Sequence, residues 1–422
     1  MGIPPIVEKY ERYYALKTEN FYFPSCEGIE QVVVIPAFAE RDYLFSTLKY
    51  LSLNEPQELK RTLVICVIND RGRGLTSEED IKNNQETLRL LYGVMKKKIS
   101  YPLGRKEIED DLDAIINSPL RLGVIDATST PLAGVGLARK LGMDRALTLF
   151  DYGRKGRKLL LSLDADTHVE SNYLTAVRDF MEKNECEAAV VGFSHRSEDN
   201  LRLTVGIVAY EIFLRYYVLG LRWAGSPYAF HTVGSTMVCT AEAYVAVRGM
   251  SRREAGEDFY FLNKLAKLGT IGRIKETTVH PAARTYVRVP FGTAKKLSLF
   301  ARNPEELFYL YDPRVFVILK RWLNLVATSR EGRGEDILKE ARAIEPLMGH
   351  FLEMMRFSEV WEKIRKNCAS SEPILRHFHF WFDAFKTMKL IRYLSRFSYP
   401  PLDMFSALVS FFQKLKEESS YN

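Results

Sequence analysis

The segment Leu159-Leu160-Leu161-Ser162-Leu163-Asp164-Ala165-Asp166-Thr167 joins a short apolar run to a pair of carboxylates. An apolar run too short for a helix predicts a buried β-strand. Side chains at i and i+2 of an extended chain point the same way, so Asp164 and Asp166 are expected to project together. Neighbouring carboxylates repel unless a positive charge lies beside them, and Mg2+ or Mn2+ suits oxygen ligands. A strand-end turn with two solvated carboxylates would explain the same residues without a ligand.

Similar apolar strands lie on both sides of this run. They are predicted at Gln31–Pro36, Arg61–Ile68, Leu122–Ile125 and Ala188–Phe193. Helical patterns separate them, and strands that alternate with helices predict an α/β fold with a largely parallel sheet covered on both faces. Ligands of such sheets bind beyond the carboxyl ends of the strands. Pro36, Asp70 and Asp164 all fall at such ends, so we expect them to line one site.

The 422 residues and the 46% hydrophobic content allow a large core and more than one domain. After about residue 295 the strand signals fade and amphipathic helices dominate. We therefore predict an N-terminal helical extension over residues 1–30, an α/β domain over 31–299 and a C-terminal helical region over 300–422.

Charge and cysteine content narrow the classes of partner. The net charge of +7 permits an anionic ligand or a membrane surface. Nucleic acid binding is not indicated, because the sequence has no basic stripe with interleaved aromatic residues. The five cysteines are scattered and include no Cys-x-x-Cys pair, so reduced thiols in a cytoplasmic protein are expected. The N-terminal residues lack the apolar core of a signal peptide.

Two segments bear on membrane contact. Leu201–Leu221 is apolar, but Glu211 and Arg215 interrupt it, which favours a buried or interfacial helix over a spanning one. Pro401–Lys416 is amphipathic enough for a protein or lipid surface, although a packed helix explains it equally. Peripheral contact at the inner face of a membrane and a homodimer are both compatible with these segments.

The second chemical signal is Gly256-Glu257-Asp258, which opens a predicted helix. Asp258 falls in the first turn, where the helix dipole favours a negative charge. An ionised carboxylate held there could serve as a positioned general base. As structure alone, both acids would be ordinary helix-start residues.

From Gln31 to about Phe300 the chain resembles the family 2 inverting glycosyltransferases, which have a GT-A, Rossmann-type fold. Five segments carry the resemblance in order and rough spacing: Val33–Glu40, Asn69-Asp70, Gly134–Lys140, Asp164-Ala165-Asp166 and Glu257-Asp258. Three positions depart from the family pattern. Phe38 and Ala39 replace the usual Tyr and Asn after the first strand, and Lys140 stands where Asn is common, so contacts from those side chains are not carried over.

The resemblance implies transfer of a sugar from a nucleoside-diphosphate sugar to an acceptor hydroxyl on a saccharide, a lipid-linked molecule or a small molecule. Asp166 would ligate Mn2+ or Mg2+, and Asp164 would contact the donor ribose or the metal shell. Asp258 would take the proton from the acceptor, which gives inversion, although related GT-A enzymes retain configuration. The other donor-binding candidates are Pro36, Ala37, Glu40, Asp70 and Arg139.

Downstream of the carboxylate motifs, His280 could add a metal ligand, or it could be a hydrogen-bonded structural residue. Arg284 and Arg288 could pair with phosphate oxygens, or they could alternate on an exposed strand. Glu257 is a further candidate for a phosphate or acceptor contact.

Other classes could use the same carboxylate pair. In phosphatases of the haloacid-dehalogenase type the first Asp of an Asp-x-Asp motif is phosphorylated, but that motif lies on an early strand, and here two strand–helix units precede it. A nucleotidyltransferase would share the sheet and the metal, but Pro36–Asp42 lacks the glycine-rich loop with a basic end. A binding protein with a decayed active site is the third alternative, which the retained carboxylates disfavour.

Overall fold

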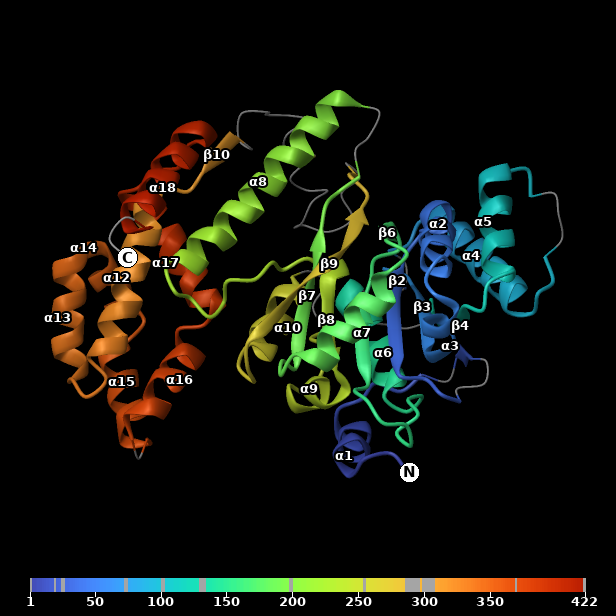
Figure 1. Cartoon of the computed structure of the whole chain (residues 1–422), viewed down its shortest axis with the longest axis horizontal. Coiled ribbons are helices and arrows are strands. Elements are labelled where there is room, and N and C mark those ends of the chain that lie inside the picture. Colours follow the sequence, from blue (N-terminus) through green and yellow to red (C-terminus); the bar gives the residue numbers. More distant parts are fainter. Residues whose placement is uncertain are drawn as a thin grey trace. The chain divides into compact units, whose positions relative to one another are not determined.

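The computed structural model describes the chain as two compact units (Figure 1). The described residues are 2–18, 20–23, 27–71, 75–99, 103–128, 134–196, 200–252, 256–284, 297, 308–368 and 370–419. The first unit comprises Met1–Asp199 and Thr232–Lys295, and the second comprises Asn200–His231 and Lys296–Asn422.

A nine-stranded sheet forms the centre of the first unit, in the order β1-β4-β3-β2-β5-β8-β7-β9-β6. Its four central parallel strands are β4 (Arg121–Ala127), β3 (Thr62–Asn69), β2 (Gln31–Ala37) and β5 (Leu159–Ser162). Every residue of β2, β3 and β5 is buried, as expected for parallel strands covered on both faces. The predicted α/β class, with a parallel sheet core flanked by helices, is confirmed.

The remaining strands extend this core on both sides. They are β1 (Phe21–Tyr22), β8 (Met237–Thr240), β7 (Ala188–Phe193), β9 (Ile271–Pro281) and β6 (Thr167–Val169). β7 and β9 are parallel to each other, whereas β1, β8 and β6 pair antiparallel with their neighbours. The carboxylate pair therefore lies in the short link from β5 to β6.

Helices cover the sheet of this unit (Figure 1). They are α2 (Arg41–Ser52), α3 (Pro56–Arg61), α4 (Glu78–Met95), α5 (Lys106–Ile116), α6 (Val135–Ala146), α7 (Tyr173–Lys183), the 3-10 helix η1 (Gly234–Thr236), α9 (Ala241–Ala246) and α10 (Glu257–Leu265). α6 packs directly on β2, β3 and β5. A Cβ on its Gly142 would lie 2.4 Å from Val34 Cγ1, so glycine permits this close approach of helix and strand.

The N-terminal helix α1 (Pro5–Tyr13) is part of the first unit and is held there by a buried polar network. Tyr10 and Tyr244 each donate a hydrogen bond to Asp144 Oδ1 at 2.7 Å, and Lys140 Nζ lies 2.9 Å from Asp144 Oδ2. Lys140, where the resembled family commonly has Asn, thus pairs with a carboxylate inside the unit and holds α1 in place.

The second unit is helical. It contains α8 (Leu201–Trp223), α12 (Arg314–Thr328), α13 (Gly334–Ile344), α14 (Pro346–Met354), α15 (Phe357–Lys366), α16 (Ser371–Trp381), α17 (Ala384–Phe397) and α18 (Met404–Ser419), with a small sheet of β10 (Tyr309–Leu310) and β11 (Leu402–Asp403). Its core includes the buried side chains of Trp322, Trp361, Phe316, Phe378 and Phe411.

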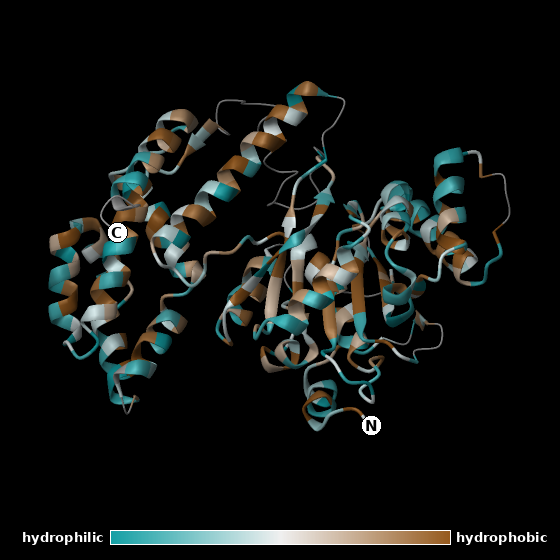
Figure 2. Cartoon of the chain, in the orientation of Figure 1, coloured by the Kyte–Doolittle hydropathy of each residue, from teal (hydrophilic) through white to brown (hydrophobic). Residues whose placement is uncertain are grey.

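α8 belongs to this helical unit, whereas the predicted boundaries placed its sequence in the α/β domain. The physical reason is aromatic packing, because Tyr216 contacts the rings of both Phe316 and Phe411. Within the described residues, α8 is long and apolar enough to cross a membrane by length and composition, and about one third of its apolar window is buried. Figure 2 shows polar and apolar turns alternating along it, and its Glu211 pairs with Arg215 at 2.5 Å.

Candidate active site

Arg139 is the centre of a first group of site residues. It lies on α6 with its side chain only 3% exposed, and its guanidinium donates hydrogen bonds to Asp164 and to Glu257. Asp164 follows β5, and Glu257 is the first residue of α10. Because one arginine binds both carboxylates, the start of α10, which also carries Asp258, is fixed beside the end of β5.

Ser235 and Gly234 complete the surroundings of this arginine. The Ser235 hydroxyl donates to Asp164 Oδ2 at 2.5 Å and lies 3.1 Å from the Thr167 hydroxyl. A Cβ on Gly234 would lie 2.3 Å from Arg139 Nη2, so the present position of the guanidinium requires a glycine there. Both carboxylate oxygens of Asp164 therefore accept hydrogen bonds from the protein, one from Arg139 and one from Ser235.

Arg284 is the centre of a second group. It follows β9, and its Nη2 lies 2.5 Å from Asp166 Oδ2 and 2.9 Å from Glu40 Oε2. Its guanidinium carbon is 4.0 Å from the centroid of the Tyr43 ring, which gives a cation–π contact. Arg284 thus joins the β5–β6 link to the start of α2, which Glu40 precedes.

Asp258 is half-buried beside the first group, and its backbone neighbour Phe259 donates an N–H to Asp258 Oδ1 at 2.7 Å. Burial is the main cause that raises the pKa of Asp258 to about 7, and the adjacent Glu257 carboxylate adds to it, while Arg139 opposes it. A carboxyl group with a pKa near neutrality can both accept and release a proton at physiological pH.

The site carries more carboxylates than cations. Its carboxyl groups are Glu40, Asp164, Asp166, Glu257 and Asp258, and its guanidinium groups are Arg139, Arg196 and Arg284. With all eight ionised, five negative and three positive charges leave a formal charge of −2, which a single divalent cation would balance.

The donor set fits a hard cation that shares its ligands with a substrate. No group of three or more His, Cys, Asp or Glu side chains suited to a metal occurs in the described part of the chain. Mg2+ and Mn2+ are often bound by one or two carboxylates together with phosphate oxygens. Asp166, with Asp164 beside it, could hold such an ion when phosphates supply further ligands and Arg284 releases Asp166.

The arginines also carry unsatisfied donors. Among the described residues, the Nε atoms of Arg139, Arg196 and Arg284 are buried without a hydrogen-bond partner. Such donors are rare in folded proteins and call for an explanation. They are a reason to expect these side chains to reorganise around a ligand that brings acceptor oxygens.

His280 lies on β9, but its contacts are not with the carboxylate pair. Its Nδ1 is 3.1 Å from the carbonyl oxygen of Ser194, and its Nε2 is 3.5 Å from Glu170. A second imidazole, that of His168, contacts the guanidinium of Arg196 and stacks on Tyr50 with ring centroids 3.9 Å apart. Burial and the neighbouring Arg196 lower the pKa of His168 to about 4, so it is neutral.

Arg196 has an additional contact, because its Nη2 donates to the backbone oxygen of Asp166 at 3.1 Å. Arg196, His168 and Ser235 were not predicted as site residues. Ser235 could have been suspected from the Gly-Ser pair before β8, but no local pattern distinguishes Arg196 or His168 from surface residues.

The ends of β2 and β3 form the other predicted part of the site. Pro36 and Ala37 are the buried last residues of β2, and Asp70 directly follows β3. Asn84 of α4 ties the two ends together, since its Oδ1 accepts from the Ala39 N–H and its Nδ2 donates to the Asn69 carbonyl oxygen, both at 2.9 Å. Arg288 lies outside the described residues.

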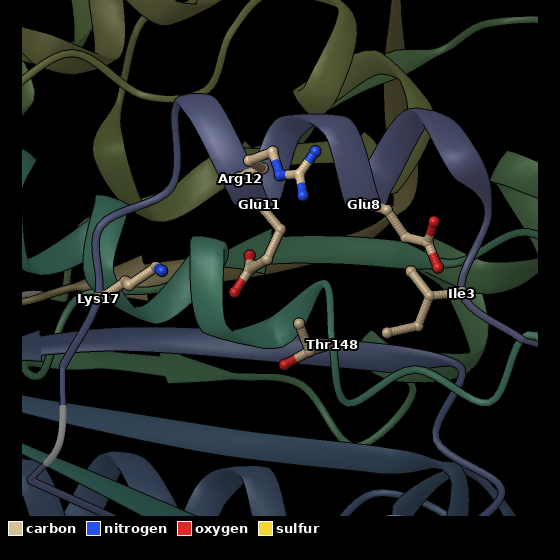
Figure 3. A pocket seen from close by; sticks show the side chains of 6 residues that line it. All are labelled: Ile3, Glu8, Glu11, Arg12, Lys17 and Thr148. Atoms are coloured by element: carbon tan, nitrogen blue, oxygen red, sulfur yellow. The ribbon is translucent and has the colours of Figure 1, made fainter.

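A separate pocket lies under α1 (Figure 3). Its lining residues are Ile3, Glu8, Glu11, Arg12, Lys17 and Thr148. In Figure 1, α1 lies below the strands of the sheet, whereas β6 lies near their upper ends. None of the predicted site residues lines this pocket, so it is distinct from the carboxylate cluster.

No protein-family model matches the chain, and no curated protein matches it in sequence. Several solved structures align with the chain at low similarity. TarS of S. aureus, residues 1–349, aligns with a TM-score of 0.37 and 11% identity over 78% of this chain and 91% of that chain, and TarS has also been solved with UDP-GlcNAc. The mannosyltransferase PcManGT of Pyrobaculum calidifontis, in complex with GDP-Man and Mn2+, aligns at 0.37 and 11% over 93% of both chains. At such values, function has to be argued from the site residues.

Proposed function

We propose that this chain is a metal-dependent glycosyltransferase that moves a sugar from a nucleoside-diphosphate sugar to an acceptor hydroxyl. The observation that carries the proposal is the convergence of Asp164 and Glu257 on Arg139, which fixes the helix start that carries Asp258, together with the Asp258 pKa of about 7. The assignments to family 2 and the GT-A fold, and a cytoplasmic location, belong to the same proposal.

The donor would lie along the carboxyl ends of the central strands. The ends of β2 and β3, with Ala37 and Asp70, would receive the nucleoside, as ligands of such sheets bind there. Asp164 would contact the ribose or the metal shell. Arg284 would turn from its carboxylate partners toward phosphate oxygens, which a planar guanidinium binds in bidentate fashion. Arg139 would keep its bridge between Asp164 and Glu257 beside the donor.

A bound Mg2+ or Mn2+ would neutralise the charge that builds on the departing nucleoside diphosphate. Asp166, with Asp164, would hold it. The formal charge of −2 and the unsatisfied arginine donors support a ligand that brings both a divalent cation and phosphate oxygens. His280 would need to leave its contacts with Ser194 and Glu170 to take part.

Asp258 would act as the general base. As its carboxylate takes the proton of the acceptor hydroxyl, that oxygen forms a bond to the anomeric carbon and the bond to the diphosphate oxygen breaks. A single displacement of this kind inverts the anomeric configuration. Positioned proton transfer of this type contributes about 10²–10⁴-fold to a rate.

The test is a screen of UDP-, GDP- and dTDP-sugars, each with and without Mn2+. A true donor should raise the melting temperature only with its metal, because a ligand that binds the native state stabilises it. The matching donor should then release nucleoside diphosphate when saccharide acceptors are added. Release of inorganic phosphate from an aryl phosphate, without a response to any nucleotide sugar, would contradict the proposal.

A further inference from the structure

α18 presents an apolar stripe away from the core of the helical unit. Phe405, Val409 and Phe412 are 78%, 57% and 50% exposed. Their spacing of four and then three residues puts them on one side of the helix. Residues Met404 and Phe411 of the same helix are buried in the core. The exposed stripe is therefore not needed for packing within the unit.

The preceding helix, α17, adds a basic stripe. Lys389, Arg392 and Arg396 are all exposed and are spaced by three and four residues. The helix ends at Phe397, whose side chain is 57% exposed. Only residues 398–403 separate α17 from α18, so the exposed Phe397 and Phe405 lie on either side of one short connection.

Cations outnumber acidic residues in this pair of helices. From Ala384 to Ser419 the chain contains six Lys or Arg and three acidic residues, and two of the three acids, Glu417 and Glu418, lie at the far end of α18. The Asp403 carboxylate is hydrogen-bonded at the start of α18, where its Oδ1 accepts the Ser406 N–H at 3.0 Å. Within the described part of the chain, the three cations of the basic stripe on α17 form no ion pair with a carboxylate. The Lys389 ammonium lies over the ring of Phe385, and the Arg396 guanidinium lies over the ring of Phe397.

We propose that α17 and α18 dock this protein on an anionic lipid surface. The aromatic and aliphatic side chains of the α18 stripe, with Phe397, would enter the headgroup region, and the unpaired cations would attract acidic headgroups. A second copy of the chain fits this surface less well. A twofold contact of the stripe with itself would bring like charges together, which is unfavourable.

This proposal does not depend on sugar transfer, because binding to vesicles needs neither donor nor acceptor. The test is co-sedimentation of the full chain with vesicles of phosphatidylcholine, alone or mixed with phosphatidylglycerol. The protein should bind the mixed vesicles and dissociate as salt is raised, since salt screens the attraction of surface charges. Equal binding to neutral and anionic vesicles, or no binding to either, would overturn it.

Variants separate the two contributions. The double change Phe405→Ser and Phe412→Ser should weaken binding to mixed vesicles by about tenfold or more, because two aromatic side chains lose their apolar burial. Arg392→Gln and Arg396→Gln should each weaken it by about fivefold. The matched control is Leu75→Ser, an equally exposed apolar residue of the first unit, which should bind as the parent does.

Two further measurements distinguish loss of lipid binding from loss of folding and from a change in oligomeric state. Melting temperatures of the variants should equal that of the parent, because the changed side chains are exposed. Analytical ultracentrifugation should show the same oligomeric state for parent and Phe405→Ser. A dimer that this change dissociates, or retained vesicle binding by the double Phe variant, would assign the surface to another partner and refute the lipid proposal.

Discussion

Arg284 Nη2 lies 2.5 Å from Asp166 Oδ2, so the carboxylate proposed to hold a divalent cation is already neutralised by an arginine. A cation and this guanidinium would compete for the same oxygen. The same arginine also contacts Glu40 at 2.9 Å, so it keeps one carboxylate partner when it leaves Asp166. Arg284 is therefore placed to exchange a carboxylate for phosphate when a donor and its metal enter together.

This relationship predicts opposite effects on two ligands. Arg284→Gln should tighten Mn2+ binding in the absence of donor by about tenfold, or about 1.4 kcal/mol, because the competing cation is gone. The same change should weaken nucleoside-diphosphate binding. Isothermal titration calorimetry measures both. Arg314→Gln is the matched control, because Arg314 pairs with Asp312 at 2.6 Å in the helical unit and should leave both affinities unchanged. Parallel loss of both affinities would indicate a purely structural arginine.

Asp258→Asn keeps the size of the side chain and removes the proton acceptor. We expect kcat to fall about 10³-fold, as for loss of a general base. The donor Kd should stay within about twofold, because Asp164 and Asp166 are untouched. Single-turnover rates and donor titration with the inactive variant separate these quantities. If donor binding disappeared while the chemical step survived, Asp258 would be a binding residue instead.

The raised pKa of Asp258 sets the pH dependence. Only the ionised carboxylate can accept a proton, so kcat/KM should rise about tenfold per pH unit up to a pH of about 7 and then level off. The free energy of unfolding depends on pH in the opposite direction to kcat/KM. The native state binds this proton more tightly than the unfolded chain, so the stabilisation is full below the unfolded pKa and is lost as pH rises through about 7.

Asp258→Asn should remove this part of the stability curve. The melting temperature of the variant relative to the parent should therefore increase between about pH 4 and pH 7, and it should stay constant above that range. Glu359→Gln is a suitable control, because that carboxylate is exposed on α15 and its pKa is lowered by Arg356. A pH-independent difference for Asp258→Asn would mean that its native pKa is not raised.

Local patterns were enough for the central strands of the sheet and for one helix start. The apolar runs at 31–36, 61–68 and 159–163 became β2, β3 and β5, because buried parallel strands need little more than apolar β-formers. The helix start at Gly256 also agrees, since Gly256 has a φ of +71°, a conformation that glycine adopts without strain. These features depend on residues that are neighbours in the chain.

Contacts between distant residues were not predictable in the same way. The spacing of Asp164 and Asp166 suggested a positive neighbour, but nothing local says that Arg139 and Arg284 provide it. The place of α8 was missed for a related reason. Its apolar residues predict burial but do not identify the part of the chain against which the helix packs. In the structure α8 packs against the aromatic core around Phe316 and Phe411.

A substitution at Gly234 tests the bridge through Arg139 without replacing a charged residue. Gly234→Ala would put a Cβ 2.3 Å from Arg139 Nη2 and force the guanidinium away from Asp164. Overpacking of this kind costs about 1–3 kcal/mol of unfolding free energy. Donor affinity and kcat should both fall, since the shift disturbs the binding of Asp164 and the position of α10. Denaturant unfolding and steady-state kinetics measure these effects.

Gly269→Ala is the control for that change, because a Cβ at Gly269 meets no atom within 4 Å. It should alter stability by no more than about 0.5 kcal/mol and leave kinetics unchanged. If Gly234→Ala were as mild as Gly269→Ala, Arg139 would have room to keep both carboxylates. The close approach of Arg139 and Gly234 would then not be what positions Asp258.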